Sequence, residues 1–279
     1  MSSILILGSG FIGNYFIELL QSLQVPYAAT TRDGRNNTIA WQLPSTLEED
    51  NQHLDITPLP LAKTILITFP VKDPKVMKVF IETYKKKYEN NNIQWILLSS
   101  TRPYTSKGTN TRHSPLDPSV DTGRLPAEEV VLSYQGSVLH LAGLWGGQRQ
   151  PKNWASRFAT EERLKTKVLV RQLHLIHGRD VARGLYAVHD QFLPGQRWLL
   201  TDGGCYDWLK LFKVWGSEEQ ITTIRHLLTQ DPDVRQLWDK NQTLEELIKN
   251  GDVDVKPRLD SKEFWETFDL KPKEFLLIE

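Results

Sequence analysis

Gly8-Ser9-Gly10-Phe11-Ile12-Gly13 is the stretch that decides the fold of this 279-residue chain. The apolar run Ile4–Leu7 precedes it and has the length of a short, fully buried strand. After it, apolar residues recur at helical spacing at Phe16, Ile17, Leu19, Leu20 and Leu23. A strand, a glycine turn and a helix in this order form the context in which G-x-G-x-x-G indicates a dinucleotide site.

Each glycine of this turn has its own physical task. Gly8 permits the tight turn, Gly10 lets the backbone approach a pyrophosphate, and Gly13 lets the helix lie close to the strand. Free N–H groups at the helix start face the phosphates, with the helix dipole behind them. We therefore predict that the glycines bind a nucleotide cofactor together with the residues between them, Ser9, Phe11 and Ile12. The alternative is a glycine-rich turn that holds no ligand.

The end of the second predicted strand bears on which dinucleotide is bound. A Rossmann fold that prefers NAD places an acid there, which accepts hydrogen bonds from the ribose 2′-OH. Here Thr31 occupies that place and Arg32 follows it, with Arg35 as a second contact. Because an arginine binds a 2′-phosphate that a carboxylate would repel, we predict NADP(H) rather than NAD(H). Asp33 leaves NAD(H) open, since a shift of two residues would restore the acid.

Strands and helices alternate along the first two thirds of the chain. After the first strand, the pattern predicts strands at 25–31, 38–41, 64–68, 93–98, 137–141 and 198–201, and helices at 75–88 and 125–134. This order is typical of a Rossmann-type α/β fold with a doubly wound parallel sheet. Phe69 and Pro70 leave the carboxyl end of one strand, so we expect them to form a wall of the cofactor cleft.

Two domains are expected. Residues 1–205 form the NADP(H)-binding domain with parts of the substrate cleft, and residues 206–279 form a smaller, mostly helical lobe. Trp145 and Trp154 lie on either side of a glycine-rich turn and are candidate aromatic residues of the substrate cleft.

Composition limits the choice of partners. Lysine plus arginine number 34 and aspartate plus glutamate also number 34, so nucleic acid or an anionic membrane gains no electrostatic support. No apolar run reaches the length of a membrane span, and the single Cys205 forms no internal disulfide. We expect no signal peptide before the first strand. We expect a cytoplasmic protein with a small-molecule substrate and no metal site, and a homodimer stays open.

The chain resembles the extended short-chain dehydrogenase family, in particular its atypical epimerase/dehydratase-like branch. The resemblance rests on the glycine turn and on four later stretches: Ser99-Ser100 with Tyr104, Leu139–Gly146, Ile176–Ala182 and, more weakly, Arg258–Ser261. The turn itself departs from the extended pattern, since Leu7 stands where the family has its first glycine.

The family transfers hydride with a serine or threonine, a tyrosine and a lysine, and the resemblance implies where these should lie. Ser100 matches the serine that orients the substrate oxygen. Val120 falls in the tyrosine position and Arg124 in the lysine position. Valine cannot transfer a proton, whereas Arg124 can still bind a ribose hydroxyl or a phosphate.

Other side chains are candidates for the missing acid or base. Tyr104 is the nearest phenol, and His113 lies in the long polar loop at 105–122. In the family-like junction at 177–180, we expect Asp180 to cap the helix and His177 to pack beside the cleft. Cys205 has no activating partner that the sequence shows.

Two functions of different classes fit these observations. One is an NADP(H)-dependent oxidoreductase or epimerase-like enzyme with catalytic candidates Ser100, Tyr104 and Arg124. The other is a redox-inactive nucleotide-binding regulator or scaffold. The fold alone does not decide between them.

Overall fold

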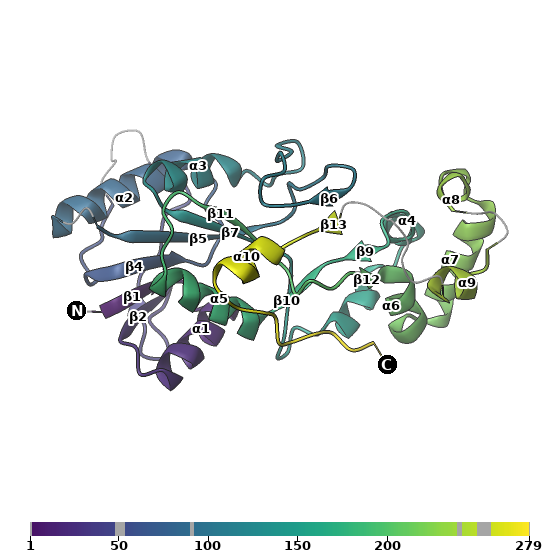
Figure 1. Ribbon diagram of the computed structural model, residues 1–279, viewed down its shortest axis with the longest axis horizontal. Helices are drawn as coiled ribbons and strands as arrows, with labels where there is room; N and C mark the ends of the chain where they lie inside the picture. The colour runs from purple at the N-terminus through teal and green to yellow at the C-terminus, as the bar shows by residue number, and fades with distance from the viewer. Residues whose placement is uncertain (1, 48–53, 90–91, 239–241, 250–257, 279) are drawn as a thin grey trace.

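The computed structural model describes residues 2–47, 54–89, 92–238, 242–249 and 258–278. Its centre is a seven-stranded sheet in which all neighbouring strands are parallel (Figure 1). The spatial order is β11-β7-β5-β4-β1-β2-β3. The strands are β1 (Ser2–Leu7), β2 (Tyr27–Thr31), β3 (Ile39–Ala40), β4 (Ala62–Ile67), β5 (Gln94–Ser100), β7 (Ser137–Leu141) and β11 (Arg197–Leu200). The predicted doubly wound parallel sheet is confirmed.

The chain runs outward from β1 in both directions, first to β2 and β3 and then through β4 to β5, β7 and β11. The strand order therefore reverses beside β1. In open α/β sheets, this reversal opens a crevice at the carboxyl ends of the strands, which is where ligands bind.

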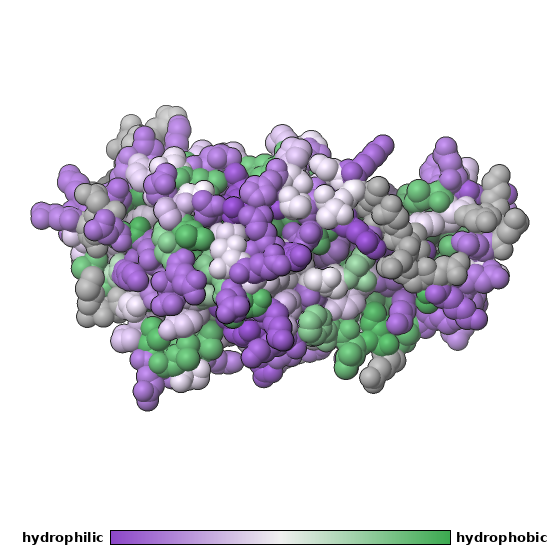
Figure 2. Space-filling view, in the orientation of Figure 1, coloured by the Kyte–Doolittle hydropathy of each residue, from purple (hydrophilic) through white to green (hydrophobic). Residues whose placement is uncertain are grey.

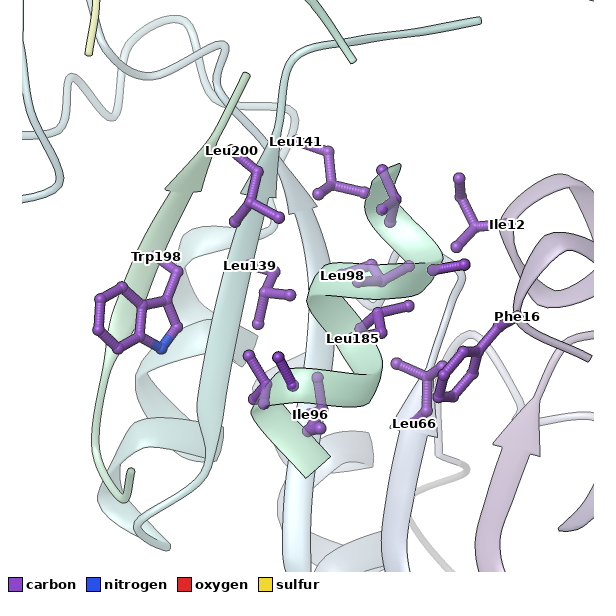
Figure 3. Packing of buried hydrophobic residues seen from close by; sticks show 14 of the residues in the cluster. Ile12, Phe16, Leu66, Ile96, Leu98, Leu139, Leu141, Leu185, Trp198 and Leu200 are labelled. Atoms are coloured by element: carbon purple, nitrogen blue, oxygen red, sulfur yellow. The ribbon is translucent and has the colours of Figure 1, made fainter. Parts of the chain in front are cut away.

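Four helices cover the two faces of the sheet. On one face lie α1 (Phe11–Ser22) and α5 (Gly178–Asp190), and on the other α2 (Pro74–Tyr88) and α3 (Leu125–Ser133). Figure 3 shows Leu185 of α5 packed among Ile96, Leu98 and Leu139 of the sheet. Strand β5 is buried on both faces, because Ile96 and Leu98 point to α5 while Trp95 and Leu97 point to α2 and α3. This is why its sequence is a continuous apolar run.

A smaller helical lobe lies at the end of the molecule away from β1 (Figure 1). It consists of the 3₁₀ helix η1 (Pro151–Arg157) and the helices α4 (Glu161–Leu169), α6 (Trp208–Trp215), α7 (Glu218–Gln230), α8 (Pro232–Leu237) and α9 (Leu244–Lys249). They share a hydrophobic core separate from the two cores of the sheet.

Three short strand pairs join these parts. They are β8 (Gly143–Trp145) with β10 (Leu175–His177), β9 (Gln172–Leu173) with β12 (Tyr206–Asp207), and β6 (Thr109–Asn110) with β13 (Arg258–Leu259).

The predicted division at residue 205 differs from the structure in two segments. Residues 151–169 precede the division, yet Ala155, Leu164 and Val168 belong to the core of the lobe. Helix α10 (Lys262–Thr267) follows it, yet packs on the sheet domain, where the Phe264 ring centroid lies 5.7 Å from that of Trp198 in β11. The sequence pattern could not show this, because both segments are ordinary amphipathic stretches whose partners are distant in the chain.

The surface seen in Figure 2 is largely hydrophilic, with hydrophobic residues in small separate groups. Across the described ranges, no helix combines the length and the apolar character that crossing a membrane requires.

Candidate cofactor-binding site

The glycine turn is tied to the ends of both neighbouring strands. Gly8 N–H donates to Thr30 Oγ1 at 3.1 Å, and Thr68 Oγ1 donates to the carbonyl of Gly8 at 2.6 Å. Gly8 has φ +94°, and a Cβ there would lie 2.7 Å from Thr68 Oγ1. Both the backbone conformation and the lack of space therefore require glycine at this position.

The other two glycines serve different purposes. A Cβ on Gly13 would lie 2.6 Å from the carbonyl oxygen of Gly8, so this glycine lets α1 approach the turn. Gly10 is the N-cap of α1, with φ −93°, and a Cβ there would meet nothing within 4 Å. The fold does not require a glycine at position 10. The space beside it opens into the crevice, and this fits a backbone surface kept clear for a phosphate.

A pocket of about 930 Å³ runs along the carboxyl ends of the strands from this turn. Its lining includes most of the residues predicted to bind the cofactor: Gly8, Ser9, Gly10, Phe11, Ile12, Thr31, Arg32, Arg35, Phe69 and Pro70. Gly13 is absent from the lining and acts through the packing of α1. Arg124 also lines the pocket, at the N-cap of α3. These residues, far apart in the sequence, thus share one cavity.

The lining of the pocket is strongly cationic. It includes five cationic side chains, Arg32, Arg35, Lys72, Arg124 and Arg149. Among the described lining residues there is no aspartate, glutamate or histidine. A concave site with charges of one sign raises the local concentration of the opposite sign, so the pocket suits a polyanion.

The β2 end of the pocket carries two of these arginines. The hydroxyls of Thr31 and Thr38 lie 2.7 Å apart, and Thr38 also donates to the carbonyl of Arg35, which fixes the loop after β2. Asp33, the acid that left NAD(H) open, is absent from the lining and forms an exposed 3.4 Å ion pair with Arg35. Of these two arginines, Arg32 forms no ion pair with a described residue.

Ser99 lines the pocket, whereas Ser100 does not. Ser99 points to the α3 side of β5, where its hydroxyl donates to the carboxylate of Glu128. Ser100 points to the opposite side and accepts a 3.3 Å hydrogen bond from Arg102 N–H. Neighbouring residues of a strand face opposite sides, so Ser99 and Ser100 present their hydroxyls to opposite faces of the sheet. The pocket is lined by Ser99 and not by Ser100, the serine predicted from the sequence.

Glu128 is completely buried and holds a small polar network. His140 Nε2 donates to its second oxygen at 2.8 Å, and Arg197 Nε lies 3.6 Å from the same oxygen. Burial acts to raise the pKa of Glu128, but the His140 and Ser99 hydrogen bonds and the charge of Arg197 hold that pKa below its ordinary value. The carboxylate is therefore ionised at neutral pH. Because Ser99 gives its one hydroxyl hydrogen to Glu128, its oxygen faces the pocket as an acceptor.

Tyr104 lies outside the pocket lining and is only 2% exposed. Its ring packs edge-on against His140, with ring centroids 5.3 Å apart, and its hydroxyl has no hydrogen-bond partner in the described chain. Burial raises the pKa of Tyr104 to about 12. The geometry does not favour Tyr104 as a proton donor to a ligand in this pocket.

The tyrosine position of the family lies outside helical structure here. Helix α3 begins at Leu125, and Val120 precedes it in a loop, 37% exposed and absent from the lining. No tyrosine occurs among the described lining residues. Arg124 remains in the pocket, and its Nε is buried without a hydrogen-bond partner among the described residues.

His113, His177 and Asp180 form contacts that stabilise the fold. His113 pairs with Glu263 of α10 at 2.9 Å and so helps to hold the long loop against the sheet domain. The expectation that Asp180 caps α5 is wrong. His177 Nδ1 accepts from Arg179 N–H at the start of α5, while Asp180 accepts from the backbone of Lys273 and Glu274.

The remaining candidates lie apart from the cofactor pocket. Cys205 is exposed and borders a separate cavity, and Trp145 packs on His177 with ring centroids 4.6 Å apart. Trp154 packs against the core of the lobe. Within the described ranges, no three histidine, cysteine or acidic side chains cluster as metal ligands would.

The sequence interpretation missed several lining residues. Lys72 follows β4 beyond Phe69 and Pro70, and Arg149 follows the glycine-rich turn after β8. The guanidinium carbon of Arg149 lies 4.9 Å from the ring centre of Phe11. Their positions after strand ends were the available signal. The others come from strand ends and connecting loops: Thr30, Trp41–Ser45, Thr68, Val71, Leu98, Leu141 and Leu144.

No family model matches the chain, and none of the curated proteins matches it in sequence. Solved structures match it over nearly its full length. A conserved protein of unknown function from Silicibacter pomeroyi DSS has a TM-score of 0.64 and 15% identity, covering 98% of this chain and 94% of its own. MoeE5, solved with UDP-glucose and NAD, has a TM-score of 0.62 and 14% identity, with 99% and 95% covered. Vestitone reductase from alfalfa (Medicago sativa L.) has a TM-score of 0.62 and 16% identity, with 98% and 94% covered.

At these identities the likeness defines the fold. The chain shares the fold of these structures, a Rossmann-type α/β fold such as the sequence pattern predicted.

Proposed function

We propose that this protein binds NADP(H) in the pocket at the glycine turn and acts as an oxidoreductase on a small carbonyl or alcohol substrate. The observation that carries the proposal is the cationic lining, which joins Arg32 and Arg35 to an intact glycine turn. MoeE5, which has the same fold, was solved with NAD, so the fold by itself does not select NADP(H). The choice of NADP(H) rests on the loop after β2.

The residues present fit the groups of NADP(H). The backbone at Gly10 and the start of α1 would hold the pyrophosphate, and the side of Gly10 on which a Cβ would lie is clear within 4 Å. Arg32, with Arg35 beside it, would bind the 2′-phosphate. Arg124, in the position of the family's lysine, would lie near the ribose on the nicotinamide side. When bound, the cofactor supplies or accepts the hydride.

The site lacks a positioned proton donor among the described lining residues. The described lining offers no phenol, imidazole or carboxylic acid, and the hydroxyl hydrogen of Ser99 is engaged by Glu128. Water or the ammonium of Lys72 would have to supply the proton. A positioned general acid contributes about 10²–10⁴-fold in rate, so we expect slow turnover.

The same observation favours a second candidate function. A protein that keeps the cofactor pocket but lacks a positioned acid can serve as an NADP(H)-binding regulator, whose state depends on the bound dinucleotide. Both functions require NADP(H) binding, so the first experiment addresses binding.

Calorimetric titration of the purified chain with NADPH and NADH tests the proposal. We expect saturable 1:1 binding of NADPH, tighter than that of NADH. Gly10→Glu should abolish it by placing a carboxylate where the pyrophosphate lies, while the unfolding temperature changes little because the added side chain enters open space. Gly10→Ala is the matched control and should keep most of the affinity. Undiminished NADPH binding by folded Gly10→Glu would refute the proposed site.

A further inference from the structure

Two groups of cations in the pocket are separated by the width of several strands. Arg32 and Arg35 follow β2, whereas Lys72 follows β4 and Arg124 precedes α3, which packs on β5 and β7. Strands β1 and β4 lie between β2 and β5. At about 4.8 Å per strand, β2 and β5 are roughly 14 Å apart. Arg32 and Arg124 therefore extend from segments of the chain at different parts of the pocket.

Lys72 and Arg124 are neighbours within that second group. A Cβ on Gly123 would lie 3.8–3.9 Å from the Cβ, Cγ and Cδ atoms of Lys72, so the lysine stem passes beside the residue that precedes Arg124. Both residues line the pocket, and their cations therefore extend from neighbouring parts of its wall.

No carboxylate neutralises this pair within the described part of the chain. Neither Lys72 nor Arg124 forms an ion pair there, and Arg124 Nε is buried without a partner. The adjacent acids accept backbone hydrogen bonds at helix starts instead: Asp73 accepts from Lys75 N–H at 2.8 Å, and Asp121 accepts from Leu125 N–H at 3.0 Å. Two like charges side by side without a counter-ion favour the binding of an anion.

The cofactor leaves this pair unneutralised. In NADP(H) bound as proposed, the 2′-phosphate lies at Arg32 and the pyrophosphate at the glycine turn. The part that extends toward β4 and β5 is the ribose and the nicotinamide, which carry no negative charge. The anion that Lys72 and Arg124 attract must then come from the second ligand of the site.

We propose that Lys72 and Arg124 bind an anionic group of the substrate, a carboxylate or a phosphate, close to the carbon that exchanges hydride. This proposal rests on the proposed function, since it places the substrate beside the nicotinamide. The class is a short oxo acid or the phosphate ester of a small carbonyl compound. A sugar joined to a nucleotide fits less well, because the sugar ring separates its diphosphate from the reacting carbon.

Matched probes of the NADPH-bound chain test the class of substrate. Dihydroxyacetone phosphate is compared with dihydroxyacetone, and 2-oxobutanoate with butanone, by the change in NADPH fluorescence on titration. We expect at least one anion to bind tenfold or more tightly than its neutral partner, and the preferred pair separates phosphate from carboxylate. Equal affinity within both pairs overturns the proposal.

Variants of Lys72 test the residues. Lys72 is exposed, so Lys72→Met should fold normally, keep NADPH affinity within twofold and lose the preference for the anion. Lys72→Arg keeps the charge and should keep the preference. Lys75→Met is the matched control, since Lys75 is an exposed lysine three residues away that lies outside the lining.

The failure of each proposal has its own signature. If Lys72→Met weakens NADPH as much as the anion, Lys72 belongs to the cofactor site and this inference fails while the proposed function stands. If the unaltered chain binds no NADPH, both fail.

Discussion

The hydroxyl of Ser99 donates a hydrogen bond to the buried carboxylate of Glu128, which joins the carboxyl end of β5 to α3. The same carboxylate accepts from His140 of β7, the residue that pairs with Ser99 in the sheet. Helix α3 is thus fixed to two strands by one ion. Since Arg124 stands at the beginning of this helix, the network also determines where that cation enters the pocket.

Glu128→Gln should destabilise the protein strongly. The two hydrogen bonds go to different oxygens of Glu128, and the amide replaces one of these acceptors by an NH₂ donor; a hydrogen bond to a charged group contributes about 1.5–3 kcal/mol. Chemical denaturation measures the loss. Glu129→Gln is the matched control, because Glu129 is an exposed residue whose pair with Arg197 contributes about 1 kcal/mol or less. Similar losses of unfolding free energy in the two variants would show that the buried network stabilises the protein no more than a surface ion pair does.

Arg32 should determine the cofactor preference. Arg32→Ala removes a charge-assisted contact to the 2′-phosphate, so we expect NADPH binding to weaken by about 1.5–3 kcal/mol and NADH binding to stay nearly constant. Calorimetry on both dinucleotides measures the difference. An equal loss for NADPH and NADH would mean that Arg32 supports the loop rather than the phosphate.

Asp202 should make stability depend on pH. Burial, outweighing the hydrogen bonds from Tyr206 and Gly204, raises the pKa of Asp202 to about 6 from its ordinary value of 3.8. The folded state therefore keeps this proton more tightly than the unfolded chain. The stabilisation is fully present below about pH 4 and is lost as the pH rises through 6, and a shift of two units corresponds to about 3 kcal/mol.

Urea unfolding at pH 4.5 and 7.5 measures the effect of Asp202. The difference in stability between the two pH values should shift in Asp202→Asn by up to about 3 kcal/mol, because the amide does not titrate. Glu162→Gln, at an exposed site on α4, serves as a control for general carboxylate effects. An unchanged pH profile in Asp202→Asn would contradict the prediction.

Tyr104→Phe should be tolerated. The buried hydroxyl has no partner in the described chain, so its removal relieves an unpaired polar group, and we expect equal or higher stability. NADPH affinity and any turnover should also persist, since the ring lies outside the lining. Thermal unfolding, calorimetry and NADPH oxidation follow these three quantities. Turnover that disappears while NADPH affinity is kept would restore Tyr104 as the acid.

Local patterns in the sequence predict much of the fold and of the cofactor pocket. The glycine turn, the buried strands and the arginines after β2 depend on neighbours within a few residues, and periodicity reports such neighbours well. The choice between Ser99 and Ser100 depends on which face of β5 meets α3. Because β5 is apolar on both faces, its sequence does not show which residues point to which face. Lys72 and Arg149 lie in loops, where no periodicity indicates the direction of a side chain.

The return of α10 to the sheet has a consequence for the order in which the chain acquires its structure during synthesis. Phe264, Trp265 and Phe268 complete the core that begins with Ile4 and Ile6, so the first strand and the last helix belong to one cooperative unit. A ribosome that has made every strand of the sheet still holds a chain in which the Trp198 ring lacks its cover. The helices of the lobe are translated before α10, so the separate core of the lobe can form while the core of the sheet domain is still incomplete. The hydrophobic core that the first strand begins is therefore completed only when the last helix has been synthesised.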